Sequence, residues 1–545
     1  MTGTHRSLPR RLRLALTAGL GAGNFFWHAY RIAPAKARER ALLHQYDRRG
    51  MQGWSLNRLR STVIRYAAAY SERGVGHGTR VGVYTSDGLA GLLHHIAITS
   101  LGGVTVLANP RMAVDVVAKF MASAAPDLVI GDRELVFDGA GPRFGVPTVE
   151  VAGFDASARS TVTPPRHYHL PDDMVLISHS SGTTGTPKPT TFTHGSFFAG
   201  KRRRLWTFPS RVDDRLLSAL PQSHSAGLSY VSLALMLGLP TLMMDDNAGR
   251  SPAEAMNDFL PTTVIGFPIS LAELRTQDLS DRAATTVRTW MGMGDASHER
   301  HIRPLVAVGD RGSTYVDGLG SSEMGMVLFK TAYTVHSTHY DRAIGKPVPA
   351  VREAVVLDED GTRLPDGQAG RLGVHAPSVT PGYVDDPTLD ERWRVGKYLL
   401  TGDVVRRDTD GTFYHLDRIQ DVITTSTGPV HSLPLEEVVL LSTNAFDAAV
   451  FAVRDPASPG HDRPAAVVLL TEPDLPPAEV LLAECNRALA EKDLPRLSAL
   501  VLARDRVGLP VGVTGKVLKR ELRRTHRDLL TRPADHSAVA GPVTR

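Results

Sequence analysis

Short β-branched runs alternate with helix-length stretches over the first 330 residues, and this alternation constrains the fold more than any other feature. The runs GTRVGVYTS, GGVTVLAN and DLVIGD occupy 78–86, 102–109 and 127–132, each bounded by turn residues. Stretches of helical length, 87–101 and 112–125, separate them. Because crossover helices join such strands, the order predicts mostly parallel sheets with helices on both faces. RLLSALP, PTLMMDD and PTTVIGF continue the pattern.

From residue 351 the pattern changes. REAVVLDEDGTRLPDGQAGRLGVHAP is typical of hairpins, with turns at DEDG and PDGQ. After Asp417 we expect strands in DAAVFAV, RPAAVVLL and SALVLA, a helix over 478–492 and a final basic helix. The predicted fold is α/β: a large N-terminal domain of mixed, mostly parallel sheets with flanking helices and a β-rich subdomain, plus a small α+β C-terminal domain. The predicted boundaries are a leader over 1–35, the large domain over 36–417, the small domain over 418–530 and a disordered tail over 531–545.

The leader has a basic cluster followed by an apolar stretch over 14–27. That stretch is shorter than the ~20 residues that span a bilayer. We expect an amphipathic helix that packs on the body of the protein, with peripheral contact to a membrane surface as the alternative. We expect the body to stay soluble when residues 1–35 are deleted.

Composition limits the setting. The 545 residues, 42% of them hydrophobic, can bury a large core in more than one domain. The net charge of +5 comes mostly from scattered arginines, dense only at the termini and in RRRL at 202–205. Without zinc-finger spacing or a basic and aromatic run, the charge favours small polyanionic substrates over nucleic acid. The single cysteine, Cys485, favours a reducing, cytoplasmic compartment and is expected to be a buried small hydrophobe.

The segment ISHSSGTTGTPKPTTFTH, 177–194, concentrates glycines and hydroxyl residues around one lysine. Glycine lets backbone N–H groups converge on an anion, and polyphosphate is the candidate. A P-loop is excluded because five residues after Gly182 stands Pro187 instead of glycine. A flexible surface loop is the simpler alternative.

The loop closely resembles the phosphate loop of the adenylate-forming superfamily, which includes acyl-CoA synthetases, firefly luciferase and the adenylation domains of nonribosomal peptide synthetases. Further segments resemble that family's motifs in the family's order, over about residues 50 to 525. They are PQSHSAG (221–227), GMGDAS (292–297), DGLGSSEMG (317–325), YLLTGDVVRRD (398–408), DRIQD (417–421) and PVGVTGKVLKREL (510–522).

The resemblance implies a role for each motif. Lys516 would bridge a carboxylate and the α-phosphate of ATP, His224 would gate the carboxylate pocket, and Glu323 would bind Mg²⁺. Asp403 would accept hydrogen bonds from the ribose, assisted by Arg418. The β- and γ-phosphates would lie on Ser181, Gly182, Thr183, Thr184, Gly185 and Lys188, and the rest of the nucleotide on Gly294, Asp295, Ala296, Asp317, Leu319 and Ser322.

The implied reaction joins a carboxylic acid to AMP, releases pyrophosphate and then forms a thioester with CoA, while the small domain turns between the two steps. ATP, Mg²⁺ and CoA are the implied cofactors. One alternative is a ligase that passes the acyl group to an amine, a carrier-protein thiol or another nucleophile, and a second is a nucleotide-binding homologue without catalysis.

The substrate is partly readable. Ser225 stands where α-amino-acid adenylation domains carry an aspartate, which argues against an α-amino acid. The expected pocket residues are small or apolar and favour an aliphatic or aryl acid: Ala226, Gly227, Leu228, Gly292, Gly318, Met324 and Gly325.

Several positions depart from the family pattern. Leu319 replaces a tyrosine that stacks on adenine, Ser322 a threonine, and Pro189 a glycine. At the hinge, Gln420 replaces an aspartate or lysine, and the following STGPVHS is expected to be an irregular loop.

Overall fold

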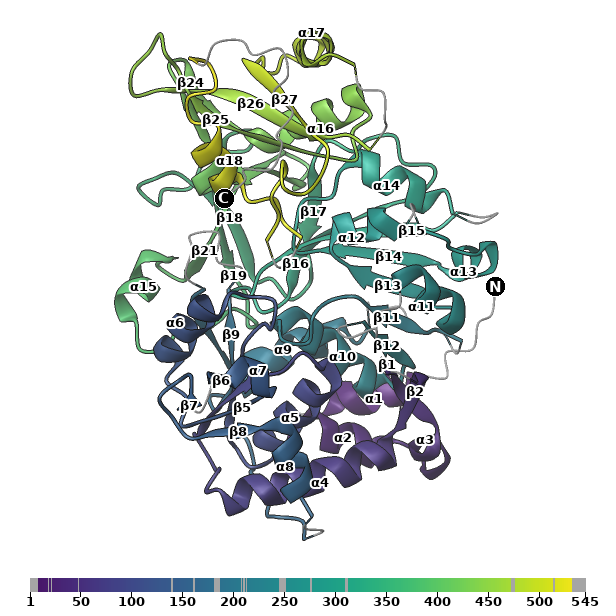
Figure 1. Ribbon diagram of the computed structural model, residues 1–545. Helices are drawn as coiled ribbons and strands as arrows, with labels where there is room; N and C mark the ends of the chain where they lie inside the picture. Colours follow the sequence, from purple (N-terminus) through teal and green to yellow (C-terminus); the bar gives the residue numbers. More distant parts are fainter. Residues whose placement is uncertain are drawn as a thin grey trace.

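The computed structural model describes residues 8–531 except 18, 21, 48, 139–140, 160–161, 181–186, 207, 209–210, 212, 245–250, 275–276, 309–311, 472–475 and 513–514. Two large sheets with flanking helices form the body, and the C-terminal segment, green to yellow, lies above them (Figure 1).

The smaller of the two sheets has the strand order β10-β9-β4-β3-β5-β8, parallel except for β10. Its strands are β3 (Arg80–Tyr84), β4 (Val104–Leu107), β5 (Leu128–Gly131), β8 (Thr148–Glu150), β9 (Met174–His179) and β10 (Pro189–Thr193). The connecting elements are α4 (Leu56–Glu72), α5 (Gly88–Ser100), α6 (Val114–Ala124), α7 (Arg133–Val136), the hairpin β6 (Phe137–Asp138) and β7 (Gly141–Pro142), and α8 (Val151–Ser157). The predicted runs at 78–86, 102–109 and 127–132 are thus central parallel strands.

The larger sheet is parallel in one half and antiparallel in the other. From β1 to β15 its neighbours pair in parallel, and from β15 to β18 they pair antiparallel. The first half contains β2 (Gly50–Ser55, antiparallel at the edge), β1 (Ala41–Asp47), β12 (Thr241–Met243), β11 (Leu216–Ser218), β13 (Thr263–Gly266), β14 (Thr289–Met293) and β15 (Thr314–Gly320). The second half contains β16 (Val327–Tyr333), β17 (Ala343–Pro347), β22 (Phe413–Arg418), β21 (Tyr398–Arg407), β19 (Ala369–His375), β18 (Glu353–Leu357) and β20 (Arg394–Val395). This second half is the β-rich part that the hairpin pattern indicated.

Helices accompany this sheet wherever the chain crosses over. They are α3 (Ala35–Glu39), α9 (His194–Arg204), α10 (Ser225–Leu237), α11 (Pro252–Phe259), α12 (Pro268–Glu273), α13 (Asp281–Thr286), α14 (Glu299–Val306) and α15 (Pro387–Arg392). A capping box at Thr193 and Ser196 starts α9, and Gly238 in the left-handed conformation ends α10. These caps fix where both helices begin and end beside the pocket described below.

The C-terminal segment has a sheet of its own, β25 (Asp447–Arg454), β26 (Asp462–Leu469) and β27 (Ala499–Ala503), with helices α16 (Ser432–Thr443), α17 (Ala478–Glu491) and α18 (Lys519–Thr525). Cys485 is fully buried in its apolar core, as expected, and burial raises the pKa of the thiol to about 11.

The hinge segment forms the short helix η2 (Ile419–Asp421). The expectation of an irregular loop at STGPVHS is wrong, since β23 (Ile423–Thr425) and β24 (Gly428–Val430) form a hairpin that leads directly into α16. Apart from Thr531, the predicted tail lies outside the described residues.

The leader differs from the expected single helix. It forms α1 (Leu8–Leu16) and α2 (Phe25–Ile32), because Asn24 caps α2 and its amide donates to the Ile96 carbonyl, 2.8 Å away. Phe25 and Phe26 are buried in the largest apolar cluster together with residues of α5 and α10, so the expected packing on the body is confirmed. Most of the large side chains in the leader's apolar stretch are therefore buried inside the protein, whereas Leu16 is exposed. None of the described helices is both long enough and apolar enough to span a bilayer.

Candidate active site

A cavity of about 160 Å³ lies where the carboxyl ends of β14 and β15 face the C-terminal segment. Crevices at this edge of a parallel sheet are the usual ligand sites of open α/β folds. The wall contains most of the residues that the resemblance assigned to the nucleotide. They are Gly294, Asp295, Ala296, Asp317, Leu319, Asp403, Arg418 and Lys516. Segments that are more than 200 residues apart in the sequence thus meet around one space.

Asp403 is held ionised at the base of this cavity. Burial by itself would raise the pKa of Asp403, but the Arg418 guanidinium, 2.6 Å away, and His415 outweigh burial and hold the pKa well below its usual range. Its other oxygen, Oδ2, is buried and makes no hydrogen bond to a described residue. A buried carboxylate oxygen without a donor suits a ribose hydroxyl.

Lys516 reaches the same cavity from a turn in which the Gly512 N–H donates to the Lys516 carbonyl at 2.8 Å. Removal from water and the nearby Arg418 lower the pKa of the lysine, while Asp295 and Asp403 oppose the shift. No hydrogen bond or ion pair joins its Nζ to another described residue. The ammonium is thus available to an anionic ligand.

The segment that is predicted to bind the phosphates is described only in part. Residues 181–186 lie outside the described residues, so the predicted contacts of Ser181, Gly182, Thr183, Thr184 and Gly185 remain predictions. Lys188 is described, and its Nζ lies 4.1 Å from the Trp393 ring centroid. Burial lowers the pKa of Lys188, whereas Glu323 raises it. Glu323 accepts a hydrogen bond from the Tyr383 hydroxyl at 3.4 Å. One carboxylate of this kind, together with nucleotide phosphates, is a typical magnesium site.

A second cavity, about 80 Å³ in volume, lies between α9 and α10. Gly294 and Gly320 line both cavities, so the two spaces meet there. His224 caps α10 and lines the second cavity, and its Nδ1 accepts the Ala226 N–H at 3.2 Å. Removal from water, with His179 and Lys516 nearby, lowers the pKa of His224 to about 3. The imidazole is therefore neutral at physiological pH and places no positive charge on a ligand.

Some predicted residues point elsewhere. Ser322 is buried, and its hydroxyl donates to the His179 carbonyl at 3.2 Å instead of lining either cavity. Asp317 does line the first cavity, but it also accepts a hydrogen bond from Ser297 at 2.8 Å, and burial raises its pKa. Of the expected pocket residues, Ala226 and Gly325 line the second cavity, whereas Leu228 and Met324 belong to the apolar core.

Sequence reasoning missed the α9 wall of this cavity. Phe197, Gly200, Lys201 and Arg204 line it at the spacing i, i+3, i+4 and i+7. That spacing marks one face of a helix, but on its own it does not say what the face meets.

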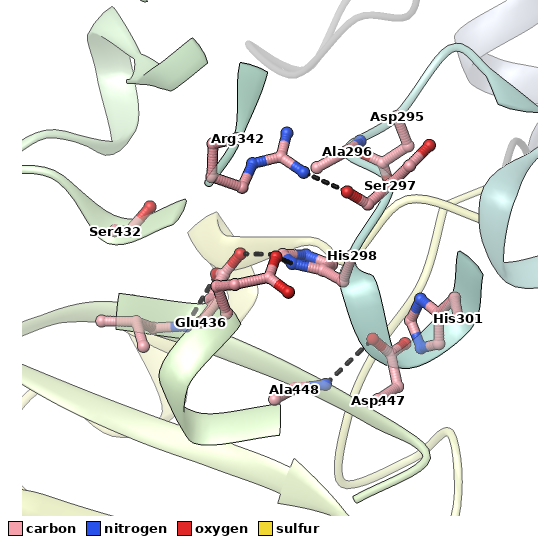
Figure 2. Close-up of polar contacts among 12 residues, drawn as sticks. Asp295, Ala296, Ser297, His298, His301, Arg342, Ser432, Glu436, Asp447 and Ala448 are labelled. Atoms are coloured by element: carbon pink, nitrogen blue, oxygen red, sulfur yellow. Dashed lines mark hydrogen bonds and ion pairs between the residues drawn. The ribbon is translucent and has the colours of Figure 1, made fainter. Parts of the chain in front are cut away.

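Polar contacts hold the C-terminal segment against residues 297–301 at the start of α14 (Figure 2). His298, at the start of α14, contacts Glu437 on α16 at 2.9 Å. Glu437 also accepts the Glu299 N–H at 2.8 Å, and His301 Nε2 lies 2.8 Å from the Phe446 carbonyl oxygen. Figure 2 also shows Arg342 donating to the Ser297 carbonyl. These contacts hold the segment in the orientation that puts Lys516 in the cavity.

Comparison with known proteins agrees with this geometry. The AMP-binding enzyme family matches residues 31–384. A 3-aminoavenalumate diazotase from Streptomyces is 34% identical over 95% of the chain and 98% of its own length. A 2-succinylbenzoate–CoA ligase from Bacillus cereus is 25% identical over 85% of the chain and 92% of its own. The anthranilate CoA ligase AuaEII, solved with anthranoyl-AMP, has a TM-score of 0.81 at 19% identity, covering 95% of this chain and all of that one.

Proposed function

Because the chain belongs to the AMP-binding enzyme family, we propose that it uses MgATP to attach AMP to an aryl carboxylic acid and then passes the acyl group to a nucleophile. One observation carries the proposal: Asp403, Lys516 and the His224 pocket surround two cavities that join at Gly294 and Gly320. A nucleotide and a small acid can therefore meet at a single point.

Charge repulsion between the carboxylate and the triphosphate is the main barrier to this reaction. Lys516 would lie between the carboxylate oxygen and the α-phosphate, where a compact cation offsets both charges. Asp403 would hold the ribose, and Lys188 with Mg²⁺ on Glu323 would take the charge of the departing pyrophosphate. The carboxylate oxygen bonds to phosphorus as the α–β phosphoanhydride bond breaks.

CoA is the first acceptor to test. Several relatives are named as ligases that form CoA thioesters, and their named acids, 2-succinylbenzoate and anthranilate, are aromatic. A flat aromatic ring suits the second cavity, which is lined by Phe197, Leu220, Phe267 and Met293 among others.

A second candidate follows from the 34% identical relative, whose name describes diazotisation of an aromatic amine. Nitrite is the reagent that turns an aryl amine into a diazonium ion, and it is an oxyanion like a carboxylate. In this reaction a nitrite oxygen would displace pyrophosphate from ATP, and the amine nitrogen would then attack the nitrite nitrogen as AMP leaves. Loss of water from the resulting nitrosamine, with uptake of a proton, would give the diazonium ion. The same cavities would serve, with the amine as the acceptor.

One assay separates the candidates. Pyrophosphate release is measured with a panel of aryl and aliphatic acids, with and without CoA, and in parallel with nitrite plus aminobenzoates. Acid-dependent release with an acyl-CoA product supports the first candidate, and nitrite-dependent release with a diazonium product supports the second. Binding of ATP without turnover in either arm would favour the non-catalytic alternative, and Asp403→Asn should then still weaken ATP binding.

A further inference from the structure

Lys201 is the least expected residue in the second cavity. It lies on α9, is 4% exposed, and lines a pocket whose other walls are mostly apolar. Its Nζ donates to the Phe197 carbonyl at 2.8 Å and to Ser229 Oγ at 3.3 Å, and lies 2.9 Å from the Phe197 ring centroid. The ammonium is therefore positioned by both helices that form the pocket.

No described carboxylate lies within 4 Å of this ammonium. Its titratable neighbours are Arg204, His95 and His194, so the surroundings are neutral or positive. Burial, with Arg204 as a second cause, lowers the pKa of Lys201 well below its usual value. A buried cation without an anion is costly, and proteins otherwise pair such groups.

Arg204 adds a second positive charge one helical turn further along the same face. It is half-buried, and it donates to the hydroxyl of Tyr230, which stands on the facing helix α10. No ion pair joins Arg204 to a described residue either. Two basic side chains thus line one small cavity in which no described carboxylate pairs with them, and a bound anion would favour their charged forms.

We propose that Lys201 and Arg204 bind a carboxylate of the substrate other than the group that is adenylated. The inference rests on the proposed function, because it assumes that the reacting group lies at the His224 end of the cavity. Under the first candidate the substrate is an aromatic dicarboxylic acid.

A purely structural role for Lys201 predicts that replacing the lysine lowers the stability of the protein, whereas a role in ligand binding does not. Methionine has a similar length and no charge, so Lys201→Met keeps the packing and removes the desolvation cost. A lysine retained for ligand binding should therefore leave a variant that is as stable as the wild type or more so. Replacing a residue that serves function commonly raises stability and lowers activity.

The test is equilibrium binding by calorimetry in the presence of a non-hydrolysable ATP analogue. The probes are the three benzene dicarboxylates and 4-carboxycinnamate, each compared with benzoate or cinnamate. Wild type should bind at least one dicarboxylate at least tenfold more tightly than its monocarboxylate. Lys201→Met and Arg204→Met should reduce that ratio to near one, whereas Arg203→Met, an exposed neighbour on α9, should leave it unchanged.

Two results would overturn the proposal. One is a wild type that prefers none of the dicarboxylates, and the other is a melting temperature of Lys201→Met that falls by several degrees. Since binding needs no turnover, the readout is independent of the reaction. If the protein prefers dicarboxylates but releases no pyrophosphate, the proposed function is wrong and the anion site stands. If it turns over monocarboxylates alone, the proposed function stands and the anion site is wrong.

Discussion

The charge states at the centre of the site are set by the surroundings of individual side chains. Asp403 stays ionised because Arg418 and His415 outweigh its burial, and His224 stays neutral because removal from water lowers its pKa to about 3. Lys516 has its pKa lowered by the same physical cause and makes no hydrogen bond or ion pair with a described residue. Under the proposed function, Lys516 would be the cation directed at the reacting atoms.

Removing that cation should affect one half-reaction. Lys516→Ala should slow formation of the adenylate by on the order of 10² to 10³, because a charge that acts mainly in the transition state is lost. Transfer from a chemically supplied adenylate should survive, since the turn of the small domain that the resemblance implies would withdraw the lysine before transfer. Single-turnover assays of each step measure this, with the exposed Lys492→Ala in the same segment as the control. Equal losses in both steps would contradict it.

At the scale of elements, the leader is part of the core. The indole N–H of Trp27 in α2 donates to Ser100 Oγ of α5 at 2.7 Å, while Phe26 is fully buried. On α1, by contrast, Leu16 is 83% exposed. The prediction that residues 1–35 can be deleted without loss of solubility therefore conflicts with the packing, since deletion would uncover this apolar surface.

A pair of substitutions measures this contribution without truncation. Phe26→Ala should lower the free energy of unfolding by about 3–5 kcal/mol, as is usual for a large aromatic side chain lost from a core. Leu16→Ala should change it by about 0.5 kcal/mol or less because the side chain is already in water. Urea titrations of both proteins provide the comparison. Equal effects would mean that the leader packs only loosely.

For the whole molecule, histidines removed from water make stability depend on pH. Desolvation is the first cause of the lowered pKa at each of them. The values are about 3 or about 4 at His28, His94, His95, His169, His179, His194 and His224. Each is neutral when folded and takes up a proton on unfolding below its ordinary pKa near 6.5. Because the unfolded chain then binds more protons, stability must fall as pH decreases from about 6.5 toward 4.

The melting temperature should therefore be nearly constant from pH 8 to 7 and decline below about pH 6.5. His169→Phe should flatten the decline. Its two ring nitrogens are buried without a described hydrogen-bond partner, and the ring stacks on His194 at 4.8 Å, so phenylalanine can replace it without losing a bond. Calorimetry across this pH range, with the exposed His77→Phe as control, provides the measurement. An unchanged slope in His169→Phe would show that this histidine does not titrate on unfolding.

Local pattern in the sequence was enough for the order of strands and helices, the parallel arrangement and the family of the chain. Strand runs, turn residues and motif spacing each depend on a few neighbouring residues, so they can be read without the fold. The same holds for Asp403, Arg418 and Lys516, which the motifs assigned to one site and which line one cavity. Their chemical roles remain predictions.

Only the tertiary structure decided which way side chains face. Ser322 lies within a motif, yet its hydroxyl donates to the His179 carbonyl. The aromatic residues of the leader pack in the core instead of facing solvent. In the sequence the basic run at 202–205 stands out only for its density of charge, but α9 places Lys201 and Arg204 in the wall of the cavity that α10 also lines. The pairing of these two helices depends on contacts between residues far apart in the chain, and such contacts leave no local pattern in the sequence.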